Sequence, residues 1–363
     1  FTGAYQAAYT ADVAVHDISV VERLVGDRKL LIDFHRPDAD RPDRLGLKLF
    51  RVNSPVPLSE RVPILENMGF KVISEMTYRI AGPGKDEAPA NIYMHDMALE
   101  RADGAAIDLD RLGRPLAKGF LAVVLGQAEN DGYNALIVKA GLHWRDIAML
   151  RAYSRYLRQA RVPYSQDYMW QTLCRHADIA GLLVHMFHAR FTPDVTDSAE
   201  RLATEEGIVE KIEAALEAVP SLDEDRIVRR FLNLIRVTLR TNFYQYDTHG
   251  EARPAFAVKL SSPSVDDLPE PHPHVEIFVY SPRVEGVHLR FAAIARGGLR
   301  WSDRPQDFRT EVLGLVKAQQ VKNAVIVPVG AKGGFVPKHL PAGNREAMLE
   351  EGIACYKIFI GSL

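Results

Sequence analysis

The sequence has few cysteines, no long apolar run and little net charge. Its 363 residues include only two cysteines, Cys174 and Cys355, which argues against a disulfide framework and favours a reducing, cytoplasmic compartment. No apolar run approaches the roughly 18 residues that span a bilayer, and the first residues do not have the pattern of a signal peptide. A formal net charge of −2 offers no field that would attract nucleic acid or an acidic membrane.

The bulk composition is that of a soluble globular protein, with 47% hydrophobic and 25% charged residues. The length predicts two or three domains with substantial cores. The chain begins at Phe1 without Met and stops inside the helical pattern of residues 356–359. We therefore expect it to be a fragment of a longer protein.

Residues 1–105 alternate short helical and strand patterns. Helices are predicted at residues 12–25 and 59–67, and strands at residues 29–34, 45–52, 70–80 and 92–99. Gly69 is placed to end the second helix. This order predicts a small α+β domain with helices on one face of an antiparallel sheet.

The rest of the chain changes character near residue 245. Residues 106–245 repeat apolar positions at helical spacing almost throughout, which predicts a helical region that connects or braces its neighbours. Residues 246–363 are predicted to form a mixed α/β domain. Its strands are expected at residues 255–260, 275–280, 287–294 and 324–329, with helices at residues 306–321 and from about Asn344 onward.

Residues 295–335 combine two glycine pairs with several cations. Gly297-Gly298 and Gly333-Gly334 permit turns and close backbone approach to a ligand. The cations are Arg296, Arg300, Arg304, Lys317, Lys322 and Lys332. Together they predict a site for a small multi-carboxylate or phosphorylated molecule. A solvated basic face beside ordinary turns is the alternative.

Lys332 is the candidate for chemistry in this segment. We expect a tight Gly-Ala-Lys-Gly-Gly turn at residues 330–334, where substrate could close over the amine. Desolvation and neighbouring cations would then lower the pKa of Lys332 and provide a neutral general base near pH 7. Arg300 and Arg304 are expected to pair locally with Asp303, Asp307 or Glu311.

The same segment resembles the substrate-binding region of glutamate dehydrogenases, most closely the very large NAD-specific bacterial type. Shorter members read KGGIR, then a helix with DEVKAL that ends in Lys, then a strand and GGAKGG. The counterparts here are residues 296–300, Thr310-Glu311-Val312, Lys322 and residues 330–334. The phrases VPLSERVPILENMGFKVISE and VAVHDI resemble ACT-like regulatory domains, for which a scaffold role and an effector site both stay open.

The resemblance implies a role for each matched residue. Lys332 corresponds to the lysine that activates water against the iminium carbon, and Lys322 to the lysine that holds the substrate α-carboxylate. A cation at a helix C-terminus is also favoured without any substrate. Arg296 replaces the lysine that holds the distal carboxylate, and we retain it with Gly297 and Gly298 as a substrate-binding residue.

Other site classes are weakly supported. Residues 330–334 are not a P-loop, because Gly follows the lysine where Ser or Thr is required. A single RGG triplet is poor support for RNA binding. His176, His185 and His188 lack acidic or cysteine partners at metal-ligand spacing, so no metal is expected.

The resemblance implies an α+β and mixed α/β multidomain oxidoreductase of amino-acid catabolism. The parent would convert L-glutamate to 2-oxoglutarate and ammonium with NAD, as a cytoplasmic homo-oligomer. No Gly-x-Gly-x-x-Gly fingerprint is present, so the NAD site is expected outside this chain, which alone should not turn over. The alternative is a regulatory or assembly module that binds an effector amino acid or partner subunits.

Overall fold

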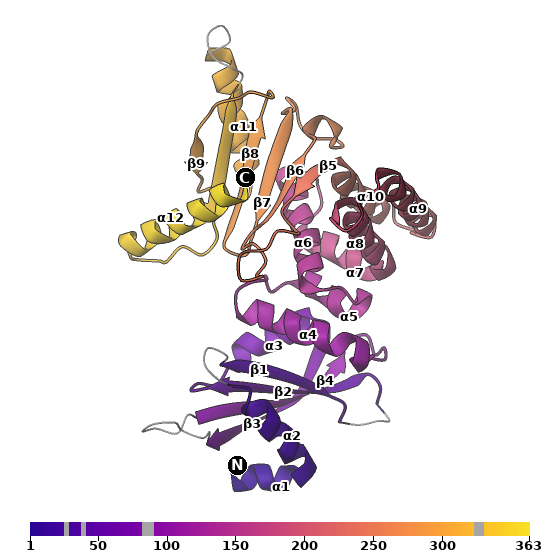
Figure 1. Ribbon diagram of the computed structural model, residues 1–363, viewed down its shortest axis with the longest axis vertical. Coiled ribbons are helices and arrows are strands. Elements are labelled where there is room, and N and C mark those ends of the chain that lie inside the picture. Colours follow the sequence, from indigo (N-terminus) through magenta and orange to yellow (C-terminus); the bar gives the residue numbers. More distant parts are fainter. Residues whose placement is uncertain (25–28, 38–40, 82–90, 323–329) are drawn as a thin grey trace. The chain divides into compact units, whose positions relative to one another are not determined.

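A computed structural model describes residues 1–24, 29–37, 41–81, 91–322 and 330–363, with the side chains of residues 320–322 excepted. The chain forms two compact units (Figure 1). The first unit comprises Phe1–Leu125 and Asn130–Trp144, and the second comprises Gly126–Glu129 and Arg145–Leu363. The sequence-based division at residues 105 and 245 stays a prediction. The strand expected at residues 324–329 lies outside the described residues.

The first unit is built on a four-stranded antiparallel sheet. Its strands are β1 (Leu30–His35), β2 (Arg44–Val52), β3 (Phe70–Ala81) and β4 (Asn91–Arg101), in the order β1-β2-β4-β3. All four predicted strands are confirmed, with ends shifted by at most two residues. Gly69 adopts a φ of +93° two positions after the last residue of α3 (Leu58–Asn67), as expected of a residue that ends a helix.

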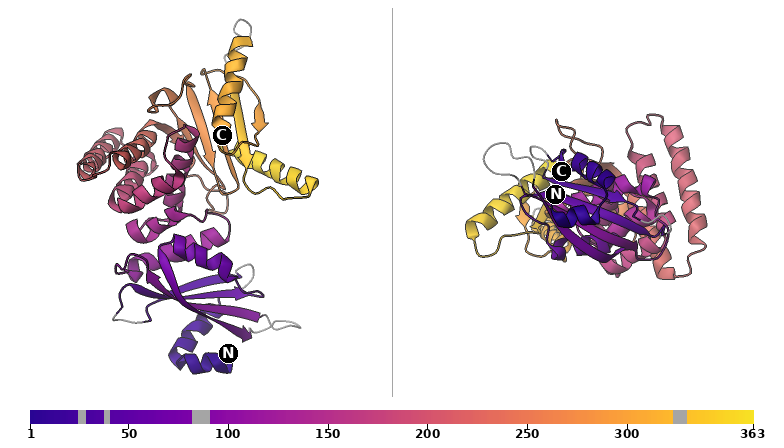
Figure 2. Two further views of the ribbon diagram at one scale, coloured as in Figure 1. Left: turned by 180° about the vertical axis from the view of Figure 1, so that it is seen from behind. Right: turned by 90° about the horizontal axis from the view of Figure 1, so that it is seen from below.

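Helices cover both faces of this sheet, so the prediction of helices on one face is wrong. The helices of this unit are α1 (Gly3–Ala8), α2 (Ala11–Val21), α3 (Leu58–Asn67), α4 (Leu109–Val124), η1 (Gly132–Ala135) and α5 (Leu136–Ala140). Figures 1 and 2 show α1 and α2 on the face opposite α3 and α4. The reason lies in β2, where every residue from Leu45 to Phe50 is buried, so neither face can be left to solvent.

A buried polar contact fixes α2 on its face. Asp17 of α2 has no exposed surface, and its Oδ2 accepts from Lys48 Nζ of β2 at 2.6 Å and from the Tyr5 hydroxyl of α1 at 2.6 Å. Around it pack Val20, Phe50 and Met94. Because the charges are paired, their burial is tolerated within an otherwise apolar layer.

The second unit begins with helices, as predicted for this part of the chain. They are α6 (Trp144–Gln159), α7 (Gln166–Arg175), α8 (Ala177–Phe191), α9 (Ser198–Leu216) and α10 (Leu222–Val237). Side chains of Ser165, Asp197 and Ser221 accept from backbone N–H groups at the starts of α7, α9 and α10. None of the helices in the described part of the chain is long and apolar enough to cross a membrane.

A six-stranded mixed sheet completes the second unit. Its order is β5 (Thr238–Thr241), β6 (Phe256–Leu260), β7 (Val275–Tyr280), β8 (Val284–Arg290), β10 (Ala331–Pro337) and β9 (Leu299–Trp301). Neighbouring strands are antiparallel except for β9 and β10, which run parallel. The sequence did not predict β5 and β9, because each is only three or four residues long.

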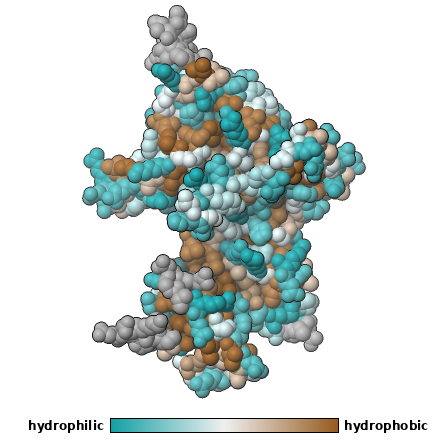
Figure 3. Space-filling view, in the orientation of Figure 1, coloured by the Kyte–Doolittle hydropathy of each residue, from teal (hydrophilic) through white to brown (hydrophobic). Residues whose placement is uncertain are grey.

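Two helices cover opposite faces of this sheet. A β-carbon on Gly334 would meet Val312 of α11 (Phe308–Lys322), whereas the adjacent Phe335 packs with Phe359 of α12 (Arg345–Ser362). Since successive strand residues point to opposite faces, α11 and α12 lie on opposite sides of β10. Apolar residues also remain on the surface beside α12 (Figure 3). They line a groove formed by Leu299, Trp301, Phe335, Leu349, Gly352, Ile353 and Tyr356.

Candidate functional site

The two glycine-rich motifs lie side by side in the second unit. The Arg296 carbonyl accepts from the Ala331 N–H at 3.0 Å, and the Gly298 carbonyl accepts from the Gly333 N–H at 3.2 Å. Beyond these bonds β9 continues as the parallel neighbour of β10, with Gly333 opposite Leu299. Two segments more than thirty positions apart in the sequence are therefore joined through their backbones.

The tight turn predicted at residues 330–334 is wrong, because Ala331–Pro337 form the strand β10 between β8 and β9. None of Gly297, Gly298, Gly333 and Gly334 has a positive φ. Small size is what most of these positions require. A β-carbon would lie 1.2 Å from the Ala331 oxygen at Gly297, 2.4 Å from Leu299 Cδ2 at Gly333 and 2.5 Å from Val312 Cγ2 at Gly334. In each case the neighbour is the protein itself, and the close approach of a ligand to these glycines stays a prediction.

Lys332 occupies the second position of β10. It pairs with Leu289 of β8 and is half-buried. Alternation along the strand places Lys332 on the same face as Gly334, which is the face covered by α11. Among the described residues, its amine has no hydrogen-bond or ion-pair partner.

Arg296 is exposed at the start of the paired segment, and its guanidinium likewise has no partner among the described residues. Its carbonyl also accepts from Gln319 Nε2 of α11 at 3.3 Å. Lys322 is the last residue of α11, but its side chain lies outside the described residues. The structure thus brings Arg296, Gly297 and Gly298 to the strand of Lys332, and the convergence of Lys322 with them stays a prediction.

The other two arginines pair locally, as predicted. Arg300 Nε lies 2.7 Å from Glu311 Oε1, and the Glu311 carboxylate also accepts from Ser302 Oγ at 2.5 Å. Arg304 Nε donates to Asp307 Oδ1 at 2.9 Å, and this hydrogen bond lowers the pKa of Asp307. Their charges are therefore balanced by carboxylates in and just before the first turns of α11.

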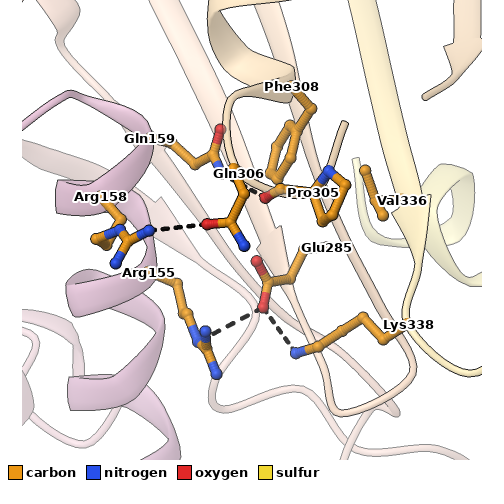
Figure 4. A pocket seen from close by; sticks show the side chains of 9 residues that line it. All are labelled: Arg155, Arg158, Gln159, Glu285, Pro305, Gln306, Phe308, Val336 and Lys338. Atoms are coloured by element: carbon orange, nitrogen blue, oxygen red, sulfur yellow. Dashed lines mark hydrogen bonds and ion pairs between the residues drawn. The ribbon is translucent and has the colours of Figure 1, made fainter. Parts of the chain in front are cut away.

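A polar pocket of about 230 Å³, which sequence reasoning missed, lies at the other end of β10 (Figure 4). It is lined by Arg155, Arg158, Gln159, Glu285, Pro305, Gln306, Phe308, Val336 and Lys338. Lys338 Nζ lies 2.7 Å from Glu285 Oε1, and Arg158 donates to Gln306 Oε1 at 2.8 Å. Lys338 is six residues from Lys332, roughly 20 Å along an extended strand, so this pocket is separate from the glycine motifs.

Two of the three histidines noted in the sequence, His176 and His188, contact protein groups. His176 Nε2 lies 2.7 Å from Glu224 Oε2, and His188 contacts Asp146 at 2.9 Å and the Tyr244 hydroxyl at 2.5 Å. Across the described ranges, no group of three or more His, Cys, Asp or Glu side chains could hold a metal ion.

The described part of the second unit does not fit a nicotinamide dinucleotide. Such cofactors bind at the carboxyl ends of a mostly parallel, doubly wound sheet. In the described part of this chain the six-stranded sheet has one parallel pair, β9 and β10, and its other neighbours are antiparallel.

Fold and site together define a class of protein, namely a multidomain α+β chain whose helical region joins a glycine-lined α/β sheet. Three family models match successive parts of it. They describe the glutamate dehydrogenase ACT3 domain at residues 29–112, the glutamate dehydrogenase helical motif 3 at residues 128–193, and the bacterial NAD-glutamate dehydrogenase catalytic domain at residues 211–363. The matched parts of the chain are therefore similar to domains of glutamate dehydrogenases, and the last of them to the catalytic domain of the bacterial NAD-dependent type.

Curated relatives agree with this assignment. The chain is 47% identical over 365 residues to the NAD-specific glutamate dehydrogenase of Pseudomonas aeruginosa and 46% identical over 368 residues to that of Halomonas elongata. It is 42% identical over 374 residues to that of Mycobacterium tuberculosis. Each alignment covers 100% of this chain but only 22% or 23% of the relative, so the chain spans about a fifth of these proteins.

Proposed function

We propose that the protein containing this chain is an NAD-dependent glutamate dehydrogenase, which oxidatively deaminates L-glutamate to 2-oxoglutarate and ammonium. The supporting observation is the backbone pairing of Arg296–Gly298 with residues 331–333, which sets an exposed guanidinium beside the strand of Lys332. The names of the curated relatives support the same activity.

Each residue would have its own role in substrate binding or catalysis, set by its charge and position. Arg296 would clamp the distal carboxylate with its planar fork, and Lys322 would hold the α-carboxylate. Gly297 and Gly298, both exposed and without side chains, would let the substrate approach the backbone. Lys332 would act as the general base toward water and the substrate amine. Neighbouring Arg300 is already paired with Glu311, which leaves Arg296 as the exposed cation for the substrate.

NAD would be bound by another part of the parent protein and would accept the hydride from the substrate α-carbon. The second unit's sheet does not fit the dinucleotide, so no step of the reaction is assigned to a cofactor contact in this chain. We accordingly expect the isolated chain to bind substrate groups without turning over.

The test is a pair of lysine variants in the full-length enzyme. Lys332→Ala should remove at least 99% of glutamate-dependent NADH formation, because general base catalysis contributes about 10²–10⁴-fold, while the thermal unfolding midpoint stays close to wild type. The matched control is Lys211→Ala, since Lys211 is an exposed lysine of α9 outside the glycine motifs. Near-normal turnover in Lys332→Ala would refute the role of Lys332.

We also propose a cytoplasmic homo-oligomer, and a division of this chain into an ACT-like part (residues 1–105), a helical part (106–245) and the start of the catalytic domain (246–363). The paucity of cysteine supports a reducing compartment. Light scattering of the full-length protein measures the subunit number, and a monomer at working concentrations would contradict the oligomer.

A further inference from the structure

The helical region holds the first turn of α11 through a buried polar cluster. Arg309, the second residue of α11, is 1% exposed, and its Nε and Nη2 donate to the two carboxylate oxygens of Glu276 in β7 at 2.9 and 3.2 Å. Glu276 is fully buried and also accepts from the Tyr156 hydroxyl of α6. One carboxylate therefore ties together a helix of the helical region, a central strand and the start of α11.

Gln159, the last residue of α6, adds a second connection. Its Oε1 accepts from the Arg309 backbone N–H at 3.1 Å, and its Nε2 donates to the Pro305 carbonyl at 3.0 Å. Figure 4 shows Gln159 next to Pro305 and Phe308, at the edge of the polar pocket. A single buried amide thus fixes both the loop before α11 and an N–H group of its first turn, which has no partner within the helix.

From there, contacts run to the glycine motifs. The Glu311 carboxylate of α11 holds Arg300 and Ser302 at β9, and Val312 packs against Gly334, two residues from Lys332. Farther along α11, Gln319 donates to the Arg296 carbonyl. A displacement of α11 would therefore shift both strands that carry the candidate substrate residues.

We propose that Tyr156 and Gln159 are positioning residues for the glutamate site, through which α6 sets the placement of α11 and hence the alignment of Arg296–Gly298 with Lys332. This inference rests on the proposed function. An apolar cluster could bury the same surface, but hydrogen bonds of fixed direction also set the orientation of the helix. The helical region then contributes to the geometry of the reaction site without touching substrate.

Variants at Gln159 test this most cleanly. Arg309→Met leaves Glu276 buried without its cation and could prevent folding altogether. Gln159→Ala removes both hydrogen bonds of the amide. Gln159→Glu keeps an oxygen that accepts from the Arg309 N–H, and it replaces the donor to Pro305 by a carboxylate oxygen that faces the Pro305 carbonyl. The matched control is Gln306→Ala, because Gln306 is exposed at the same junction and accepts a hydrogen bond from Arg158.

Two measurements in the full-length enzyme test whether Gln159 positions α11. They are steady-state kinetics with L-glutamate and hydrogen exchange of the amides in residues 308–319. Gln159→Ala should lower kcat on the order of tenfold, because small misplacements of catalytic groups are costly, with faster exchange in α11. Gln159→Glu should recover part of the loss through the retained bond to the Arg309 N–H, and Gln306→Ala should match wild type.

Wild-type kcat and exchange in Gln159→Ala would overturn the inference, as would an equal loss in Gln306→Ala. Failure of the proposed function gives a different result, which is a wild-type enzyme that forms no NADH from glutamate. In that event the exchange of α11 would still show whether Gln159 anchors the helix, with unchanged exchange counting against it.

Discussion

Gly297 and Ala331 approach so closely that a β-carbon on Gly297 would lie 1.2 Å from the Ala331 carbonyl oxygen. The contact is between two backbones, so no flexible side chain can move aside to relieve it. It sits at the start of the parallel pairing that joins the two glycine-rich motifs. Gly298, the next residue, has no described atom within 4 Å of such a β-carbon.

This contrast gives a stability prediction with a built-in control. Gly297→Ala should lower the free energy of unfolding by about 1–3 kcal/mol or more, the range typical of overpacking, whereas Gly298→Ala should lower it by less than about 0.5 kcal/mol. Urea unfolding of the chain measures both. Equal stability of the two variants would contradict the close approach at Gly297.

A second prediction concerns Gly334 and Val312. A β-carbon on Gly334 would lie 2.5 Å from Val312 Cγ2, and Val312 is fully buried. Gly334→Ala and Val312→Ala should each destabilise the chain by about 1–3 kcal/mol, through overpacking and through lost burial respectively. The double variant should lose less than the sum of the single losses, because the new methyl group fills the vacated space. Additive losses in a double-mutant cycle would count against the packing of α11 on β10.

Glu129 should make stability depend on acid pH. Burial alone would raise the pKa of its carboxyl group, yet the charges of Lys338, Arg155 and Arg151 lower it to about 2, from an ordinary value of 4.5. Because the folded-state pKa is depressed, the ionised carboxylate stabilises the fold above about pH 4.5 by up to about 3 kcal/mol. That contribution is lost as the pH falls toward 2.

The measurement is chemical unfolding of wild type and Glu129→Gln between pH 7 and pH 3. The wild type should be the more stable at pH 7, and the gap between the two should narrow steadily below about pH 4.5. A gap that stayed constant, or widened, in acid would contradict the ion pairs with Lys338 and Arg155.

Arg296 should control substrate affinity in the full-length enzyme. Arg296→Ala removes the proposed clamp on the distal carboxylate and should raise the KM for L-glutamate roughly 10- to 100-fold, since hydrogen bonds to charged groups contribute about 1.5–3 kcal/mol. Arg296→Lys keeps a positive charge without the planar fork and should fall between wild type and Arg296→Ala. An unchanged KM in Arg296→Ala would remove Arg296 from the substrate site.

Local patterns in the sequence predicted most of the elements. The strands around Leu47 and Met94 alternate or cluster apolar residues strongly, and Ser165, Asp197 and Ser221 cap helices in the usual way. The motif at residues 296–300 and the motif at residues 330–334 were sufficient to indicate the family.

Local sequence patterns could not predict contacts between residues that are far apart in the sequence. Gly333-Gly334 suggested a turn because glycine is usually depleted in strands, but here it lets Val312 and Leu299 pack against a central strand. The bond between Glu276 and Arg309 joins residues 33 positions apart, and no spacing rule connects them. The helix at Gly3–Ala8 is only six residues long, too short to show a helical period, and no local pattern indicated that it and α2 would cover the face opposite α3 and α4.

The composition of the second unit affects how the protein can be shortened. The match to the catalytic domain starts at residue 211, whereas the unit also includes α6, whose Tyr156 and Gln159 reach Glu276 and Arg309. A chain trimmed to begin at residue 211 would lack α6. The Glu276 carboxylate, the Arg309 guanidinium and the apolar side chains that α6 covers would then be exposed to water. The start of the family match thus falls inside the second unit, and a piece that keeps the whole unit must start no later than Gly126.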